Sequence, residues 1–175
     1  FEKFACLIQH PVTTEKNLSK KQILQTLKGI KKIGIPTFAI MPNNDAGYEN
    51  IIKEIKYSKI KWTKNLSLSE YKSVLKNCNL LIGNSSSGIH ETATYKVPVI
   101  NIGSRQNRRL KSKNVIDVNY NSNEISKKIK IVLSTQFRKN LKNLKNPYGD
   151  GNSALRMIKI LKNINIKENT QKTIT

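Results

Sequence analysis

Residues 80–91 read Leu80-Leu-Ile-Gly-Asn-Ser-Ser-Ser-Gly-Ile-His-Glu91. An apolar, strand-like run meets Gly83, three consecutive serines follow, and helix-like sequence begins around Gly88. A strand, a glycine-containing turn and a helix start are typical of anion sites, because glycine permits a close approach and the first N–H groups of a helix are unpaired. The stretch predicts that Ser85, Ser86, Ser87 and Gly88 bind a phosphate or diphosphate.

An ordinary helix N-cap with a flexible loop is the alternative, since serine often caps helices. A capping box would place Ser or Thr three residues before Glu91, and that position is Gly88, so Glu91 needs another role. The pattern also lacks the Gly-Lys-Ser/Thr ending of a Walker loop and does not match G-x-G-x-x-G. Phosphate binding and capping therefore both stay open on this stretch alone.

Short apolar runs alternate with helical periodicity on both sides of this stretch. The predicted strands are 4–8, 37–41, 59–62, 79–82, 97–102 and 115–118. The predicted helices are 14–30, 48–55, 68–75, 87–95, 122–133, 137–144 and 154–161. The alternation indicates an α/β, Rossmann-like fold with a parallel sheet and flanking helices. We expect one domain over residues 1–164 and a polar, frayed tail over 165–175.

Polar residues follow four of the predicted strands. His10 follows the first strand, Asn43 the second, Ser85 the fourth and Arg105 the fifth. In open parallel sheets, ligands bind beyond the carboxyl ends of the strands, so these residues should meet at one rim. A lone His is more often structural, Asn43 suits a simple turn and Arg105 suits a solvated basic loop, and each of these plainer interpretations stays open.

The composition is that of a basic globular domain, with 175 residues, 37% hydrophobic residues and a formal net charge of +21. The lysines are spread along the chain and only 6% of residues are aromatic, so we do not expect nucleic acid as the main ligand. The positive electrostatic field of the chain would instead attract anionic small molecules. We expect no membrane segment and no metal site, with Cys6 and Cys78 as buried free thiols.

With these motifs assembled, the chain resembles the C-terminal half of the hydrolysing UDP-N-acetylglucosamine 2-epimerases, in the branch that serves sialic-acid-type biosynthesis. The resemblance rests on five motifs in the family's order, namely 10–15, 42–47, 83–91, 98–106 and 148–152. The Asn-Ser-Ser-Ser-Gly stretch and the Arg105-Gln106 pair are nearer to the hydrolysing than to the non-hydrolysing branch.

The resemblance implies the C-terminal nucleotide-binding half of a GT-B fold and a nucleotide-sugar substrate. Ser85 and Ser86 would hold the diphosphate and Glu91 the ribose hydroxyls. The segment Asn65-Leu66 would contact the base. His10, as the catalytic candidate, would line the phosphate and sugar side together with Asn43 and Arg105. The implied reaction expels UDP, forms a glycal-type intermediate and adds water to give N-acetylmannosamine, with no cofactor and no metal.

The family's acid/base carboxylates lie largely on an N-terminal domain, so we expect a fragment that is inactive alone, and a full-length protein that is cytoplasmic and homo-oligomeric. UDP- or GDP-N,N'-diacetylbacillosamine is an alternative substrate. A GT-B glycosyltransferase nucleotide domain and, more remotely, a basic nucleic-acid-binding module are alternative functions.

Overall fold

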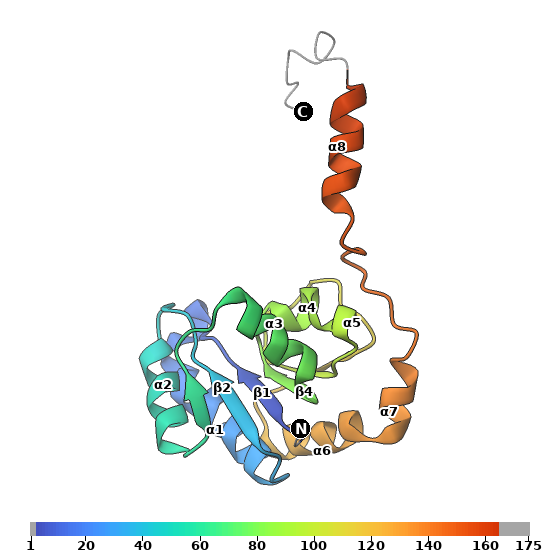
Figure 1. Cartoon of the computed structure of the whole chain (residues 1–175). Coiled ribbons are helices and arrows are strands. Elements are labelled where there is room, and N and C mark those ends of the chain that lie inside the picture. The colour runs from blue at the N-terminus through green and yellow to red at the C-terminus, as the bar shows by residue number, and fades with distance from the viewer. Residues whose placement is uncertain (1–2, 165–175) are drawn as a thin grey trace.

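Six parallel strands form one sheet in the order β3-β2-β1-β4-β5-β6 in the computed structural model, which describes residues 3–164 (Figure 1). The strands are β1 Ala5–Ile8, β2 Thr37–Ile40, β3 Lys61–Thr63, β4 Leu80–Gly83, β5 Val99–Ile102 and β6 Val115–Val118. Leu7 lies opposite Ala39 on β2 and opposite Ile82 on β4. Strand order therefore reverses beside β1, which creates the crevice where α/β proteins bind ligands.

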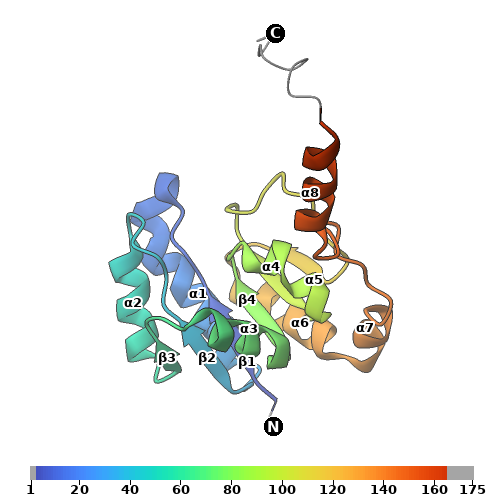
Figure 2. The same ribbon diagram turned by 45° about the horizontal axis from the view of Figure 1, so that its top comes forward.

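Helices cover both faces of the sheet (Figures 1 and 2). They are η1 Thr13–Leu18, α1 Ser19–Lys31, α2 Tyr48–Tyr57, α3 Leu68–Asn77, α4 Ser87–His90, α5 Thr92–Tyr95, α6 Ser122–Leu133, α7 Thr135–Asn140 and α8 Ser153–Asn163. Alternate strand residues face opposite layers, so Leu7 packs with α1, α2 and α6, whereas Cys6 packs with α3. Burial on both faces explains why the central strands β1 and β4 are continuous apolar runs.

Burial confirms that Cys6 and Cys78 are free thiols in the core. Burial raises the pKa of Cys6, and it raises the pKa of Cys78 to about 12. Both thiols therefore stay protonated and act as small apolar side chains rather than nucleophiles.

The predicted helix over 87–95 is broken at Glu91, which lies between α4 and α5 with φ −111° and ψ −41°. The Thr92 hydroxyl donates to the Gly88 carbonyl at 2.8 Å, and the side-chain amide of Asn114 donates to the same hydroxyl at 3.0 Å. A hydroxyl bonded to the carbonyl four residues earlier bends a helix, which accounts for the break.

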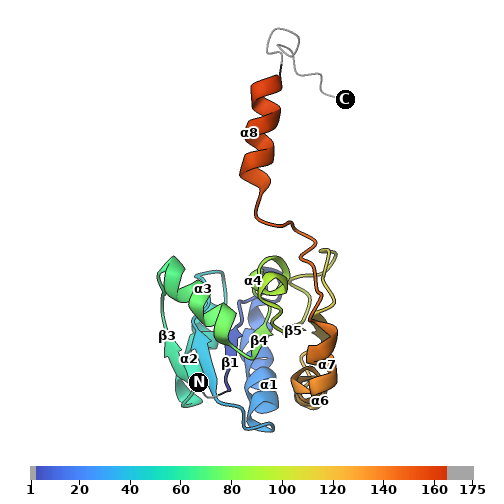
Figure 3. The same ribbon diagram turned by 45° about the vertical axis from the view of Figure 1, so that its right-hand side comes forward.

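Helix α8 extends away from the sheet (Figures 1 and 3). Leu155, Ile158 and Leu161 share a face as predicted, yet they are 67%, 49% and 65% exposed. The apolar face of α8 is thus uncovered by the rest of the described structure. The tail predicted for 165–175 lies outside the described residues.

Candidate functional site

The carboxyl ends of β1 and β4 are joined by one buried side chain, Asn84. Its Oδ1 accepts from the His10 backbone N–H at 2.7 Å, and its Nδ2 donates to the His10 carbonyl at 2.9 Å. The backbone N–H of Asn84 also donates to the Ile8 carbonyl at 3.1 Å. Asn84 is fully buried, so these bonds fix the position of His10 at the reversal of strand order.

His10 faces Asn43, which follows β2. His10 Nδ1 lies 3.0 Å from Asn43 Oδ1 and 3.1 Å from the Asn43 backbone nitrogen. Asn43 Nδ2 donates to Asp45 at 2.6 Å, which orients the amide oxygen toward the imidazole. Burial, followed by the nearby Arg105 charge, lowers the pKa of His10. The imidazole is therefore neutral at pH 7 and can hold or transfer a proton.

Arg105, in the loop after β5, reaches the same rim. Its Nη1 donates to the Asn84 carbonyl at 3.3 Å, and its Nη2 lies 4.0 Å from the Asp45 carboxylate. The next residue, Gln106, is buried and donates to the Asn84 carbonyl at 2.8 Å. The contacts of the guanidinium are long, so most of its donor capacity is available to a ligand.

The serine turn lies at the end of β4, beside His10. Within residues 3–164, the backbone N–H groups of Ser85 and Ser86 donate to no acceptor. The Ser87 hydroxyl is hydrogen-bonded to the Tyr71 hydroxyl of α3. Two unpaired N–H groups and the serine hydroxyls form a cluster of donors suited to an anion.

Close packing against neighbouring strands requires glycine at both Gly83 and Gly88. Gly83 has φ +129°, and a Cβ there would lie 2.0 Å from the Ile8 carbonyl oxygen. A Cβ on Gly88 would lie 2.9 Å from a Val99 methyl. Both glycines allow β4 and α4 to lie close to neighbouring strands, and the ligand contact predicted for Gly88 stays a prediction.

The remaining predicted residues lie on the same edge of the sheet with fewer contacts. Glu91 is exposed at the helix break, and its carboxylate makes no hydrogen bond or ion pair with residues 3–164. Asn65 is exposed in the loop after β3, where its carbonyl accepts from the Thr63 hydroxyl at 3.0 Å. Leu66 is half-buried and packs beside α3. Asn65 and Glu91 therefore lie at the same edge of the sheet as His10 and Arg105, but no hydrogen bond connects them to those residues within residues 3–164.

Two contributions were missed from sequence. The role of Asn84 was not predicted, since nothing in a single sequence signals a side chain that bridges two strand ends. The contacts of His90 were not predicted either. Its Nε2 lies 3.1 Å from Arg109 Nη1, its ring centroid lies 4.3 Å from that of Tyr148, and its carbonyl accepts from Asn146 at 2.7 Å. The segment that contains Asn146 and Tyr148 is therefore held beside α4.

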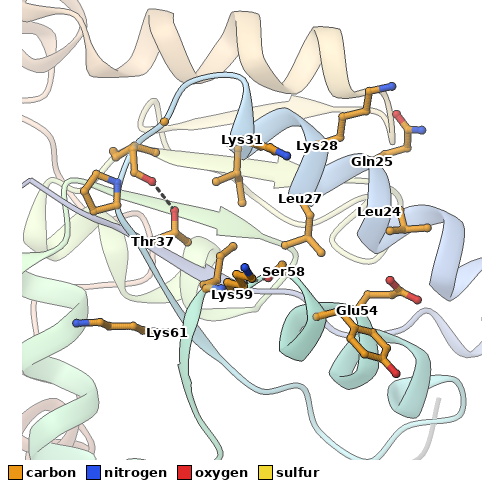
Figure 4. Close-up of a pocket in the computed structure, with 16 residues that line it drawn as sticks. Leu24, Gln25, Leu27, Lys28, Lys31, Thr37, Glu54, Ser58, Lys59 and Lys61 are labelled. Atoms are coloured by element: carbon orange, nitrogen blue, oxygen red, sulfur yellow. Dashed lines mark hydrogen bonds between the residues drawn. The ribbon is translucent and has the colours of Figure 1, made fainter.

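A hollow of about 1000 Å³ lies at the opposite end of the sheet. Figure 4 shows that it is lined by the ends of α1 and α2 and the starts of β2 and β3, including Leu27, Thr37 and Lys61. It has mostly apolar walls and a lysine rim. None of the predicted site residues lines it, so we place the site at the carboxyl rim despite its smaller hollows.

No group of three or more His, Cys, Asp or Glu residues suited to a metal ion occurs in residues 3–164. Over the same range, no helix has both the length and the apolar character needed to cross a membrane.

Comparisons with known proteins identify the family of the chain. The family model described as UDP-N-acetylglucosamine 2-epimerase matches residues 1–162. A UDP-N,N'-diacetylbacillosamine 2-epimerase (hydrolyzing) of Legionella pneumophila is 34% identical over 93% of this chain and 43% of its own length. A UDP-N-acetylglucosamine 2-epimerase of Neisseria meningitidis is 34% identical over 71% of this chain and 34% of its own length.

Solved structures share the fold. The N. meningitidis UDP-GlcNAc 2-epimerase bound to UDP-GlcNAc superposes with a TM-score of 0.74 at 16% identity, over 93% of this chain and 45% of that one. The E. coli heptosyltransferase WaaC with ADP superposes with a TM-score of 0.52 at 15% identity, over 80% of this chain and 44% of that one. The chain thus has the Rossmann-like architecture of one half of a GT-B fold. It spans less than half the length of the curated relatives that it matches. From the family model and these relatives, the chain belongs to the UDP-N-acetylglucosamine 2-epimerase family.

Proposed function

We propose that this chain is the nucleotide-sugar-binding half of a hydrolysing UDP-N-acetylglucosamine 2-epimerase. The observation that carries the proposal is the meeting of His10, Asn43, Ser85 and Arg105 at the carboxyl ends of four different strands, across the reversal of strand order. A site assembled from separate strand ends suits a ligand with several polar parts, such as a nucleoside diphosphate sugar.

The diphosphate would lie between the serine turn and the Arg105 loop. The unpaired N–H groups of Ser85 and Ser86 would donate to phosphate oxygens from one side, and the Arg105 guanidinium from the other. Glu91, exposed and without a protein partner in the described residues, would accept from the ribose hydroxyls. Asn65 and Leu66 would line the base at the β3 edge. The net charge of +21 favours the approach of such an anion.

These donors would also assist the proposed reaction. The bond between C1 of the sugar and the diphosphate oxygen breaks, the diphosphate leaves with the bonding electrons, and the C2 proton is removed, which gives a glycal-type intermediate. Water then adds, with its hydroxyl at C1 and a proton at C2 on the opposite face, and N-acetylmannosamine is released. Fixed donors around the leaving diphosphate stabilise the charge that develops on it.

His10 would contribute a neutral imidazole beside the sugar and phosphate. Its lowered pKa lets it donate or accept one proton near neutral pH without holding a permanent charge there. We propose that the acid/base carboxylates belong to the part of the enzyme that this chain does not span, and that no cofactor is needed. The uncovered apolar face of α8 would pack against that part.

The identity of the sugar and base is a separate question. The Legionella and Neisseria relatives carry names that differ in the sugar, at the same 34% identity to this chain. UDP- or GDP-N,N'-diacetylbacillosamine is therefore the second candidate substrate. The heptosyltransferase neighbour has the same fold, which makes a glycosyltransferase the alternative reaction class.

Calorimetric titration of this chain with UDP, GDP and a short RNA tests the proposed ligand. We expect one nucleoside diphosphate to bind, Arg105→Ala to weaken that binding about tenfold or more, and RNA to bind weakly. Tight RNA binding that survives Arg105→Ala and Ser85→Ala would overturn the proposal. For the full-length enzyme, a proton NMR time course should show free 2-epimerised sugar and nucleoside diphosphate, whereas transfer of the sugar to an acceptor would identify a glycosyltransferase. This chain alone should show no turnover.

A further inference from the structure

We propose that Glu15 is a positioning residue that sets the Arg105 loop for diphosphate binding, an inference that rests on the proposed function. Glu15 belongs to η1, where its φ of −120° and ψ of 22° depart from helical values. Its carboxylate connects two elements far apart in sequence. Oε1 accepts from the Ser104 hydroxyl at 2.8 Å, and Oε2 accepts from the side-chain amide of Gln22 at 2.6 Å.

The bond to Ser104 acts directly beside Arg105. On one side of Arg105, Ser104 is tied to Glu15. On the other side, buried Gln106 is tied to the Asn84 carbonyl at 2.8 Å. The guanidinium itself makes only long contacts, at 3.3 Å to Asn84 and 4.0 Å to Asp45. The direction of Arg105 is therefore fixed mainly by its two anchored neighbours.

The loop needs such anchoring because its entry is a sharp turn. Gly103 has φ +76°, and a Cβ there would lie 2.4 Å from the ring of Tyr120. Glycine restricts the backbone less than any other residue, so backbone rotation at Gly103 would displace the residues that follow it, including Arg105. Tyr120, Gly103, Ser104 and Glu15 line one polar hollow of about 360 Å³. The bond between Glu15 and Ser104 joins two residues that line this hollow, and it restricts the movement of the loop.

A carboxylate is the side chain that this position requires. Gln22 is 5% exposed, and it presents its amide N–H to Glu15, while Ser104 presents its O–H. Both partners donate, so the bridging group needs two acceptors. In Glu15→Gln, one acceptor becomes an NH₂ group, so the Gln22 amide or the Ser104 hydroxyl has to turn to meet it, and the two charge-assisted bonds become weaker neutral ones. The double variant Glu15→Gln with Gln22→Glu restores a donor and an acceptor in that pair.

The first test uses the whole chain and a ligand-independent readout, hydrogen exchange of the backbone amides. We expect Glu15→Gln to accelerate exchange over residues 103–107, where Gly103 N–H bonds to Val118 and Asn107 N–H to Ser104, and to leave the core strands unchanged. The double variant should restore most of the protection. Unchanged exchange over 103–107 in Glu15→Gln would overturn the proposal.

The second test measures UDP and uridine affinity by calorimetry. Glu15→Gln should weaken UDP about fivefold to tenfold and leave uridine unchanged, with no further loss in an Arg105→Ala background. Glu49→Gln, the same charge change at an exposed position of α2, is the control. Equal losses for UDP and uridine, or additive losses with Arg105→Ala, would contradict a role through Arg105. Absence of UDP binding by the unmodified chain would instead count against the proposed function, while hydrogen exchange would still decide the role of Glu15.

Discussion

The side-chain amide of Asn84 pairs with the backbone of His10 through both its oxygen, at 2.7 Å, and its nitrogen, at 2.9 Å. The pair joins the ends of two neighbouring parallel strands after their ladder has ended at Gly83. The Asn84 carbonyl in turn accepts from Arg105 and Gln106. One buried asparagine therefore holds together three of the loops that form the candidate site.

We expect Asn84→Ala to destabilise the chain by about 2 to 4 kcal/mol, because it leaves the buried N–H and carbonyl of His10 without partners. Urea unfolding followed by circular dichroism measures the change. Asn77→Ala is the matched control, since Asn77 is exposed and bonds only within its own helix, and it should change stability by less than about 0.5 kcal/mol. Equal effects of the two substitutions would show that the hydrogen bonds between Asn84 and the His10 backbone do not stabilise the fold.

Gly83→Ala should be more damaging than its small size suggests. The new methyl group would meet the Ile8 carbonyl oxygen at 2.0 Å, and φ at this position is +129°. We expect a loss of about 3 kcal/mol or more, or failure to fold. Gly34→Ala provides the control, because Gly34 also has positive φ, +70°, but open space around it, so only about 1 kcal/mol should be lost. Thermal unfolding separates the two outcomes, and similar losses would contradict the packing explanation.

Much of this fold could be predicted because its signals are local. Most of the six strands are short, mainly apolar runs, and the polar residues that follow four of them meet where parallel topology requires. The break at Glu91 was not predicted, because it depends on Thr92 bonding to Gly88 and to the distant Asn114. Boundaries also shifted, as at β3, which starts at Lys61 after Lys59 adopts φ +61°.

The central site residues were predictable by type and place, but not by how they are held. An acidic residue such as Glu15 suits the first turn of a helix, and nothing in the sequence indicates that its carboxylate reaches Ser104 across 89 positions. Likewise, the packing of Gly88 against Val99 was not predicted. Long-range partners of this kind leave no periodicity or spacing in a single sequence, so the structure was needed to find them.

Glu91 offers a test of how the nucleotide lies. If its carboxylate accepts from the ribose hydroxyls, Glu91→Ala should weaken UDP by about 1 to 3 kcal/mol and should have no effect on 2',3'-dideoxy-UDP. The expected loss is that of hydrogen bonds to a charged acceptor. Calorimetry with the two nucleotides measures it, and Glu49→Ala serves as a control for the change in charge. Equal weakening of both nucleotides would remove Glu91 from the ribose contact.

Ser85→Ala should act on the phosphates instead. Removal of its hydroxyl is expected to weaken UDP by about 1 to 2 kcal/mol and leave uridine unaffected. Ser126→Ala is the control, because Ser126 lies on α6 and its hydroxyl bonds to the carbonyl of Asn123. A loss shared equally by uridine would indicate that the serine turn supports the base or ribose, and would contradict the placement of the diphosphate there.

The protonation of His10 should be visible in the pH dependence of stability. Burial and the Arg105 charge lower its pKa in the folded chain below the unfolded value of about 6.5. As pH falls through about 6.5, the unfolded chain therefore binds a proton that the folded chain does not, so stability decreases until the folded pKa is also passed. Above that window His10 contributes no dependence on pH.

His10→Gln removes this one titration. Between about pH 8 and about pH 5, the free energy of unfolding of the unmodified chain should decrease more steeply than that of the variant, by at most about 1.4 kcal/mol per pH unit. Urea unfolding at a series of pH values gives the two slopes, and groups common to both chains cancel in their difference. Arg105→Ala should raise the pKa of His10, followed by NMR of the imidazole protons, because it removes the second cause of the lowered value. Identical slopes, together with an unshifted titration in Arg105→Ala, would mean that His10 is neither buried nor close to the guanidinium in solution, and the proposed role of a neutral imidazole would then fail.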